Sequence, residues 1–290
     1  MSTSADNGRK LANTNQRPTI SVIIPTFNRC GYLGQAIDSV LNQTYPADEL
    51  IVVDDGSTDG TSDLLAAYTD RLTVIRQINQ GVSAARNAGI RQSHGTYIAL
   101  LDSDDYWLPE KLKEQHAFFD SHPDAVICQT EETWIRNAKR INPKKRHQKF
   151  SGMIFEKNLP LCLVSPSAVM IRKGLFEEVG LFDESLPACE DYDMWLRISW
   201  KYPIHLVDTP LVVKRGGHSD QLSSMAELDK YRIQALVKIL AQGCLSAFQQ
   251  KAAMDTLTRK CAIYANGCRK RGRLQEAEHY FNLPKSIEAG

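Results

Sequence analysis

Short apolar runs alternate with amphipathic segments through the first hundred residues. Runs rich in β-branched residues predict strands, and segments whose apolar positions recur every three or four residues predict helices. The predicted strands are residues 19–24, 50–53, 72–76 and 97–101, and the predicted helices are 33–41, 61–68 and 81–91. Such alternation is typical of right-handed βαβ crossovers and a mostly parallel sheet.

Less regular patterns follow residue 124. We expect strands at 125–129, 167–172 and 206–213, a short helix at 176–180 and another helix that begins at 190. From about residue 225 the chain shows amphipathic helical stripes, whose usual role is packing onto the main domain. Contacts with a second copy of the chain, forming a homodimer, or with a membrane surface are the alternatives.

These patterns divide the chain into a tail, a large domain and a helical end. Residues 1–17 are polar and lack the apolar segment of a secretory signal, so we expect a disordered tail. Residues 18–223 form the expected α/β domain, in two halves that meet between residues 124 and 125. Residues 224–290 form a C-terminal helical region.

The composition of the 290 residues is that of an ordinary soluble protein, with 42% hydrophobic and 24% charged residues. A net charge of +1 gives no reason to expect a nucleic-acid partner. The seven cysteines include no Cys-x-x-Cys pair, which weakens zinc and redox-motif interpretations and suits a reducing cytosol. No apolar run is long enough to span a bilayer. We therefore expect a cytoplasmic protein, with a peripheral position at the inner face of the membrane as the alternative.

The apolar run 97–101 ends in a cluster of acidic residues, Asp102, Asp104 and Asp105, with Ser103 among them. Carboxylates this close repel one another unless a cation lies between them, and their hard oxygens suit Mg²⁺ or Mn²⁺. The simpler alternatives are a solvated loop, or Asp105 as the N-cap of a helix that starts near Pro109.

Polar residues follow two other predicted strands in the same way. They are Thr26 and Asn28 after the first strand, and Asp54 and Asp55 after the second. In open parallel sheets, ligands bind outside the carboxyl ends of the strands. The sequence therefore predicts a ligand site at this edge of the sheet.

Three later features also carry candidate chemistry. The stretch 136–149 has seven Lys and Arg and no acidic residue; a solvated loop is the simpler interpretation, and a lid that attracts an anionic acceptor or a membrane surface is the alternative. Glu190 and Asp191 begin a predicted helix, where carboxylates also favour the helix dipole. His218 follows two glycines, and a lone histidine is more often structural than a metal ligand.

Taken together, five motifs resemble those of family 2 glycosyltransferases with the GT-A fold. They are SVIIPTFNR at 21–29, VVDDGSTD at 52–59, GVSAARNAG at 81–89, DSDD at 102–105 and EDYDMWLR at 190–197. The resemblance covers residues 19–223. It implies a GT-A type, Rossmann-like, mostly parallel sheet flanked by helices, with the C-terminal helices as an extension, and it makes 18–124 the nucleotide-binding half and 125–223 the acceptor-binding half.

The same resemblance assigns roles to particular residues. It implies that the nucleotide sugar is bound by Pro25, Thr26, Asn28, Asp54, Asp55, Gly81, Arg86, Asp102 and Ser103. It makes Asp104 and His218 ligands of Mn²⁺ or Mg²⁺. It makes Asp191 the catalytic base, with Glu190 orienting the base or the acceptor.

The implied reaction is metal-dependent and inverting. A sugar moves from a nucleoside-diphosphate sugar, with UDP favoured, to a hydroxyl of a saccharide, lipid-linked saccharide or protein acceptor, as in cell-envelope polysaccharide, glycolipid or glycoprotein synthesis. A nucleotidyltransferase is the first alternative, but it would usually show a Gly-rich basic loop after the first strand, and residues 25–31 hold a single glycine. A nucleotide-sugar-binding protein without transfer activity is the second; the joint presence of Asp104, Asp191 and His218 argues against it.

Overall fold

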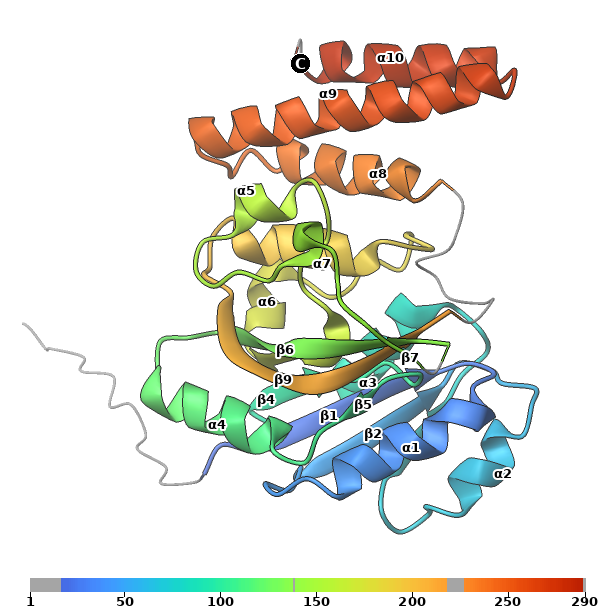
Figure 1. Cartoon of the computed structure of the whole chain (residues 1–290), viewed down its shortest axis with the longest axis vertical. Coiled ribbons are helices and arrows are strands. Elements are labelled where there is room, and N and C mark those ends of the chain that lie inside the picture. The colour runs from blue at the N-terminus through green and yellow to red at the C-terminus, as the bar shows by residue number, and fades with distance from the viewer. Residues whose placement is uncertain (1–16, 138, 218–226, 289–290) are drawn as a thin grey trace, which may run out of the picture.

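The computed structural model describes residues 17–137, 139–217 and 227–288, and Figure 1 shows their arrangement. The tail predicted at 1–17 lies outside these residues except for Arg17, whose guanidinium pairs with Asp48 at 2.6 Å. The remaining chain forms a sheet flanked by helices, with three further helices at one end of the molecule (Figure 1).

The first half forms the parallel part of the sheet, as predicted. Its strands lie in the order β3-β2-β1-β4 and all pair in parallel. The strands are β1 (Ile20–Thr26), β2 (Glu49–Asp54), β3 (Thr73–Arg76) and β4 (Tyr97–Leu100), and the helices between them are α1 (Cys30–Leu41), α2 (Thr61–Ala66) and α3 (Val82–Gln92). Because β1 and β4 are buried on both faces, their sequences are mainly apolar and do not alternate between apolar and polar residues.

Helices cover both faces of this part of the sheet. On one face, α1 packs with α4 (Lys111–Ser121), and on the other, α3 packs with α6 (Leu175–Val179) and α7 (Glu190–Ser199). The small residues of α3 permit a close approach: a Cβ at Gly89 would lie 2.4 Å from Cγ2 of Ile23. This packing holds the start of α3 at the edge of the sheet.

The second half makes the sheet mixed rather than mostly parallel. Beyond β4 the order continues β8-β6-β9-β5, and antiparallel pairs join β4 to β8, β8 to β6 and β9 to β5. These strands are β5 (Tyr106–Trp107), β6 (Ile127–Arg136), β8 (Val169–Arg172) and β9 (His205–Gly216). The prediction of parallel pairing therefore holds for the first half, where helices connect neighbouring strands, and not for the β4–β8 junction, because β8 enters beside β4 in the opposite direction.

The strand predicted at 125–129 is much longer in the structure. β6 continues to Arg136 and forms a hairpin with β7 (Lys139–Ile141), which is followed by a 3₁₀ turn at Lys145–His147. The interpretation of 136–149 as a loop was therefore wrong for these parts. Pairing of Trp134 with Ile141 orders the hairpin.

The C-terminal region is helical, as predicted. Helices α8 (Leu228–Ala241), α9 (Ala247–Lys270) and α10 (Leu274–Glu288) stack beside α7 and α5 (Phe155–Asn158) (Figure 1). Their apolar faces share one core with Phe155 and Tyr192, so this region packs onto the main domain. Among the described residues, no helix combines the length and apolar character needed to cross a membrane.

Candidate active site

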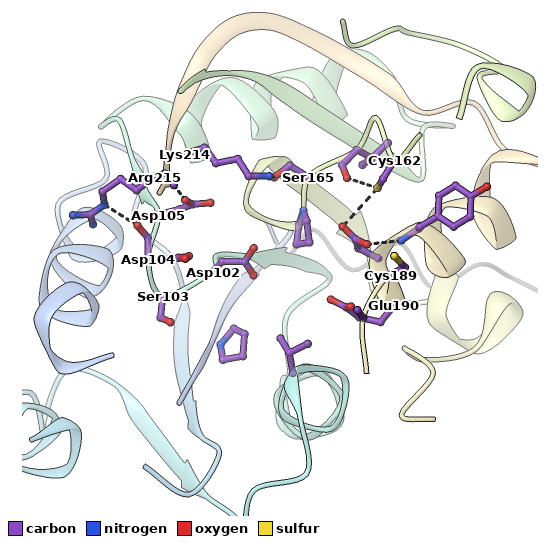
Figure 2. A pocket seen from close by; sticks show the side chains of 18 of the residues that line it. Asp102, Ser103, Asp104, Asp105, Cys162, Ser165, Cys189, Glu190, Lys214 and Arg215 are labelled. Atoms are coloured by element: carbon purple, nitrogen blue, oxygen red, sulfur yellow. Dashed lines mark hydrogen bonds between the residues drawn. The ribbon is translucent and has the colours of Figure 1, made fainter. Parts of the chain in front are cut away.

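A cleft of about 1090 Å³ opens at the carboxyl ends of β1, β2 and β4 and extends to the start of α7 and the end of β9. Most of the predicted site residues line it: Pro25, Thr26, Asn28, Asp55, Gly81, Arg86, Asp102, Ser103, Asp104, Glu190 and Asp191. Figure 2 shows Asp102, Asp104 and Glu190 around one space, with Lys214 and Arg215 along its edge. Residues from both halves of the domain therefore meet in one cleft.

Two predicted residues are missing from this set, for different reasons. Asp54 is buried at the end of β2, does not line the cleft, and accepts the backbone N–H of Ser57 at 2.9 Å, so it closes the turn after the strand. His218 lies outside the described residues.

The loops after β1 and β2 are tied together through Asn28. Its side-chain oxygen accepts the Thr58 N–H at 2.8 Å, and its own N–H donates to Ser57 Oγ at 2.9 Å. Asn28 has φ of 50°, a left-handed conformation that Asn tolerates better than most residues. Beside it, Thr26 Oγ1 is buried and has no hydrogen-bond partner among the described residues, which leaves a polar atom available to a ligand.

Asp55 is fixed by Gln77 and Gln80, to which the sequence gave no role, and by the predicted site residue Gly81. Its Oδ1 accepts from Gln77 Nε2 at 2.6 Å and from the Gln80 N–H at 2.9 Å, and its Oδ2 accepts the Gly81 N–H at 2.8 Å. Gly81 has φ of 91°, a backbone conformation that favours glycine over other residues. A carboxylate has about four acceptor positions, so Asp55 retains capacity for one further donor.

Arg86 connects the two sides of the cleft. Its buried guanidinium donates through Nη2 to Asp102 Oδ1 at 2.7 Å and through Nη1 to Glu190 Oε1 at 2.6 Å. Burial acts to lower the pKa of Arg86, but these two carboxylates outweigh it and raise that pKa above its ordinary value. Both terminal nitrogens are thus engaged within the chain, and Arg86 holds Asp102 and Glu190 in place.

Asp105 does not cap the following helix. It is buried, its Oδ2 accepts from Ser167 Oγ at 2.7 Å, and its Oδ1 accepts the Arg215 N–H at 2.9 Å. Helix α4 begins without a side-chain cap. Burial, with the nearby Asp104 carboxylate, raises the pKa of Asp105 well above its usual range. The N-cap interpretation was therefore wrong, because Asp105 joins the acidic turn to β9.

The helix α7 presents the second pair of carboxylates. Cys189, which precedes the helix, has φ of 62°, and this turn brings both Glu190 and Asp191 to the cleft. Glu190 is buried; burial raises its pKa, and Arg86 opposes this effect. Asp191 accepts its neighbour Tyr192 N–H through Oδ1, and Cys162 Sγ lies 3.6 Å from its Oδ2. Asp191 is only partly buried, so its carboxylate is the more accessible of the two.

Lys214 is a cleft residue to which sequence analysis gave no role. Its Nζ lies 3.2 Å from Ser165 Oγ. Burial acts to lower the pKa of Lys214, but the carboxylates of Glu132, Asp105, Asp102 and Asp191 together raise it. Lys214 directly follows the apolar residues 211–213, and this was the available signal in the sequence, the same kind that marked Asp102.

The chain is similar to glycosyltransferases in sequence. The model of the family "Glycosyl transferase family 2" matches residues 21–180. An uncharacterized glycosyltransferase of Rickettsia prowazekii is 32% identical over 221 residues, which cover 74% of this chain and 69% of that protein. The putative teichuronic acid biosynthesis glycosyltransferase TuaG of Bacillus subtilis is 43% identical over 109 residues, which cover 36% of this chain and 43% of TuaG.

The fold is similar to that of a solved structure. The S. aureus TarS fragment 1-349, crystallised in complex with UDP-GlcNAc, superposes with a TM-score of 0.71 at 21% identity, over 92% of this chain and 79% of that one. The family model covers more than half of the chain, and the expected GT-A type of fold is confirmed. The chain belongs to glycosyl transferase family 2, and the protein is a glycosyltransferase.

Proposed function

We propose that this enzyme moves a sugar from a nucleoside-diphosphate sugar, with UDP favoured, to an acceptor hydroxyl with inversion at the anomeric carbon. The observation that carries this proposal is the meeting of Asp104 and Asp191 in one cleft, each from a different half of the domain. The TarS structures with UDP-GlcNAc and with UDP support a UDP-sugar donor. The relative TuaG supports a role in cell-envelope polysaccharide synthesis.

The nucleoside would lie over the ends of β1 and β2. Asp55 accepts hydrogen bonds only, so its remaining acceptor position suits the N–H of a uracil ring. Thr26 Oγ1 offers an unpartnered hydroxyl beside it. Arg86 holds Asp102 in place. Asp102 would then face the ribose side of the donor.

The donor set at the acidic turn fits a divalent cation that takes most of its ligands from a diphosphate and water. Asp102 and Asp104 both line the cleft with hard oxygens, whereas no group of three or more Cys, His, Asp or Glu side chains suited to a metal occurs within the described residues. We propose Asp104 as the protein ligand of Mn²⁺ or Mg²⁺, with His218 as a second ligand. When bound, such a cation would supply positive charge to stabilise the leaving diphosphate.

Asp191 is the proposed base. It would accept the proton of the acceptor hydroxyl while the hydroxyl oxygen bonds to the anomeric carbon and the bond to the diphosphate oxygen breaks. A single displacement of this kind inverts the configuration. Glu190 is buried and bound to Arg86, so we assign it a positioning role rather than proton transfer.

The Asp191→Asn variant tests this assignment. A thermal-shift screen of nucleotide sugars with and without Mn²⁺ first identifies the donor. With that donor, the variant should form UDP by hydrolysis or transfer at least about a hundredfold more slowly than wild type, because it lacks a base. Its Kd for UDP should stay the same. Asp208→Asn, at an exposed position on β9, is the matched control and should behave as wild type. Unchanged donor hydrolysis and transfer in Asp191→Asn would show that the base is elsewhere.

A further inference from the structure

One wall of the cleft comes from the β6–β7 hairpin and the 3₁₀ turn that follows it. We call the exposed cations of this segment the basic wall; they are Arg136, Lys139, Arg140, Lys144, Lys145 and Arg146. The sequence from 133 to 149 contains no acidic residue. The wall therefore carries positive charge without a local counter-charge.

One cation of this segment, Lys149, has a structural role and is not part of the basic wall. Lys149 is buried and pairs with Glu132 at 3.0 Å, and it also donates to the Thr130 carbonyl. Within the described part of the chain, none of the basic-wall residues forms an ion pair. The pKa of His147 is lowered, first by burial and then by the charges of Arg146, Lys214 and Lys144, which outweigh the opposing charge of Glu132.

The basic wall reaches into the site. Arg136, Arg146 and His147 line the cleft, and so do the apolar side chains of Trp134 and Ile141. Trp134 is fixed, because its Nε1 donates to Glu132 at 2.7 Å. A fixed aromatic face beside cations suits a ligand that is partly apolar and partly anionic, such as a charged sugar ring.

We propose that the acceptor is an anionic glycan, namely a saccharide or polyol polymer with carboxylate or phosphate groups, and that the basic wall binds it. This inference rests on the proposed function. Positive charge along a cleft concentrates an anionic polymer and speeds its association. A membrane surface is less favoured, because Ile141 is the only large exposed apolar side chain among the described residues of this segment, and it lines the cleft. The donor diphosphate alone would leave most of the six cations without a partner.

The test compares two double variants. In Arg136→Gln with Arg146→Gln, the wall loses two cleft-lining cations. In Lys251→Gln with Arg259→Gln, α9 loses two exposed cations that lie outside the cleft and form no ion pair with described residues. The probes are tetragalacturonic acid, a glycerol-phosphate oligomer, neutral maltotetraose, and phosphatidylcholine vesicles with phosphatidylglycerol. The Kd for UDP with Mn²⁺ is measured in parallel.

We expect wild type to bind one or both anionic oligomers more tightly than maltotetraose, and to lose this preference at high salt. The wall variant should weaken that binding by about tenfold, which corresponds to about 1.4 kcal/mol, with its UDP affinity unchanged. The carboxylate and phosphate oligomers distinguish the two chemical sources of charge.

Several results would overturn the proposal. Equal binding of neutral and anionic oligomers, an equal loss in the α9 control, or a parallel loss of UDP affinity would each do so. Binding of vesicles alone, lost in the wall variant, would assign the wall to a membrane surface instead. If wild type binds UDP but no anionic oligomer, only this inference fails, whereas absence of UDP binding contradicts the proposed function itself.

Discussion

Arg86 and Glu190 lie 104 positions apart in the sequence and meet in a buried hydrogen bond of 2.6 Å between Nη1 and Oε1. The same guanidinium holds Asp102 at the end of β4. Asp191, the proposed base, follows Glu190 directly on α7. One side chain therefore fixes the distance between the donor side of the cleft and the residue proposed to activate the acceptor.

Replacing Arg86 by Lys should break the connection between Asp102 and Glu190. Lysine keeps the positive charge, but its single ammonium group cannot reproduce the two-pronged contact. We expect kcat to fall by at least about tenfold and the free energy of unfolding to fall by about 1–3 kcal/mol, because one carboxylate loses its partner. Steady-state kinetics and urea unfolding measure both effects.

Arg91→Lys is the control for this experiment. Arg91 lies on the same helix and pairs with Glu184 at 3.2 Å, but both side chains are largely exposed. Exposed ion pairs contribute about 1 kcal/mol or less, so this variant should resemble wild type. If Arg86→Lys instead keeps the wild-type kcat and stability, the contacts of Arg86 with Asp102 and Glu190 do not position the site.

Asp104→Ala should remove the dependence of donor binding on metal. In wild type, Mn²⁺ should tighten UDP binding, because Asp104 would hold an ion whose charge attracts the diphosphate. In the presence of Mn²⁺, the variant should bind UDP at least about tenfold more weakly than wild type, a loss of about 1.4 kcal/mol in binding free energy. Its thermal unfolding temperature should stay within a few degrees of the wild-type value. Titration calorimetry with and without Mn²⁺ provides the measurement. Asp124→Ala, at an exposed position, serves as control, and undiminished Mn²⁺-dependent UDP affinity in Asp104→Ala would reject this site.

Lys111 should make stability rise with pH above neutrality. It is fully buried, its Nζ donates to Gln115 Oε1 at 2.6 Å, and burial lowers its pKa from 10.5 to about 7. Between these pH values the unfolded chain binds a proton that the folded chain lacks, so the free energy of unfolding increases with pH, by up to about 1.4 kcal/mol per unit.

The Lys111→Met variant lacks this group and should lack this contribution. Its stability relative to wild type should therefore be greatest near pH 7 and should decline by up to about 2 kcal/mol by pH 9, as measured by urea unfolding. Lys113→Met changes an exposed lysine of the same helix and should show no such trend. Parallel stability curves for wild type and Lys111→Met would contradict the assigned pKa.

The strands at the centre of the sheet could be predicted from sequence because buried strands consist largely of consecutive apolar residues. β1 and β4 are mainly apolar, and Thr26 and Asp102 stand at or just beyond their carboxyl ends, so the position of both residues at one edge of the sheet followed from pattern alone. The family motifs added the separate segment at Asp191, which periodicity could not connect to that edge. Asp104 and Asp191 do line one cleft.

Other features depended on partners that are distant in the chain. The sequence offered a helix cap as one interpretation of Asp105 and favoured a loop for 136–149. Nothing local reveals the Ser167 hydroxyl that binds Asp105 or the Glu132 carboxylate that pairs with Lys149. Pattern and propensity describe interactions among near neighbours. Ion pairs and buried polar contacts require two segments to meet at a particular distance and orientation. Only the folded chain therefore decided that Arg86 joins Asp102 to Glu190 and that two residues of the basic wall, Arg136 and Arg146, line the cleft.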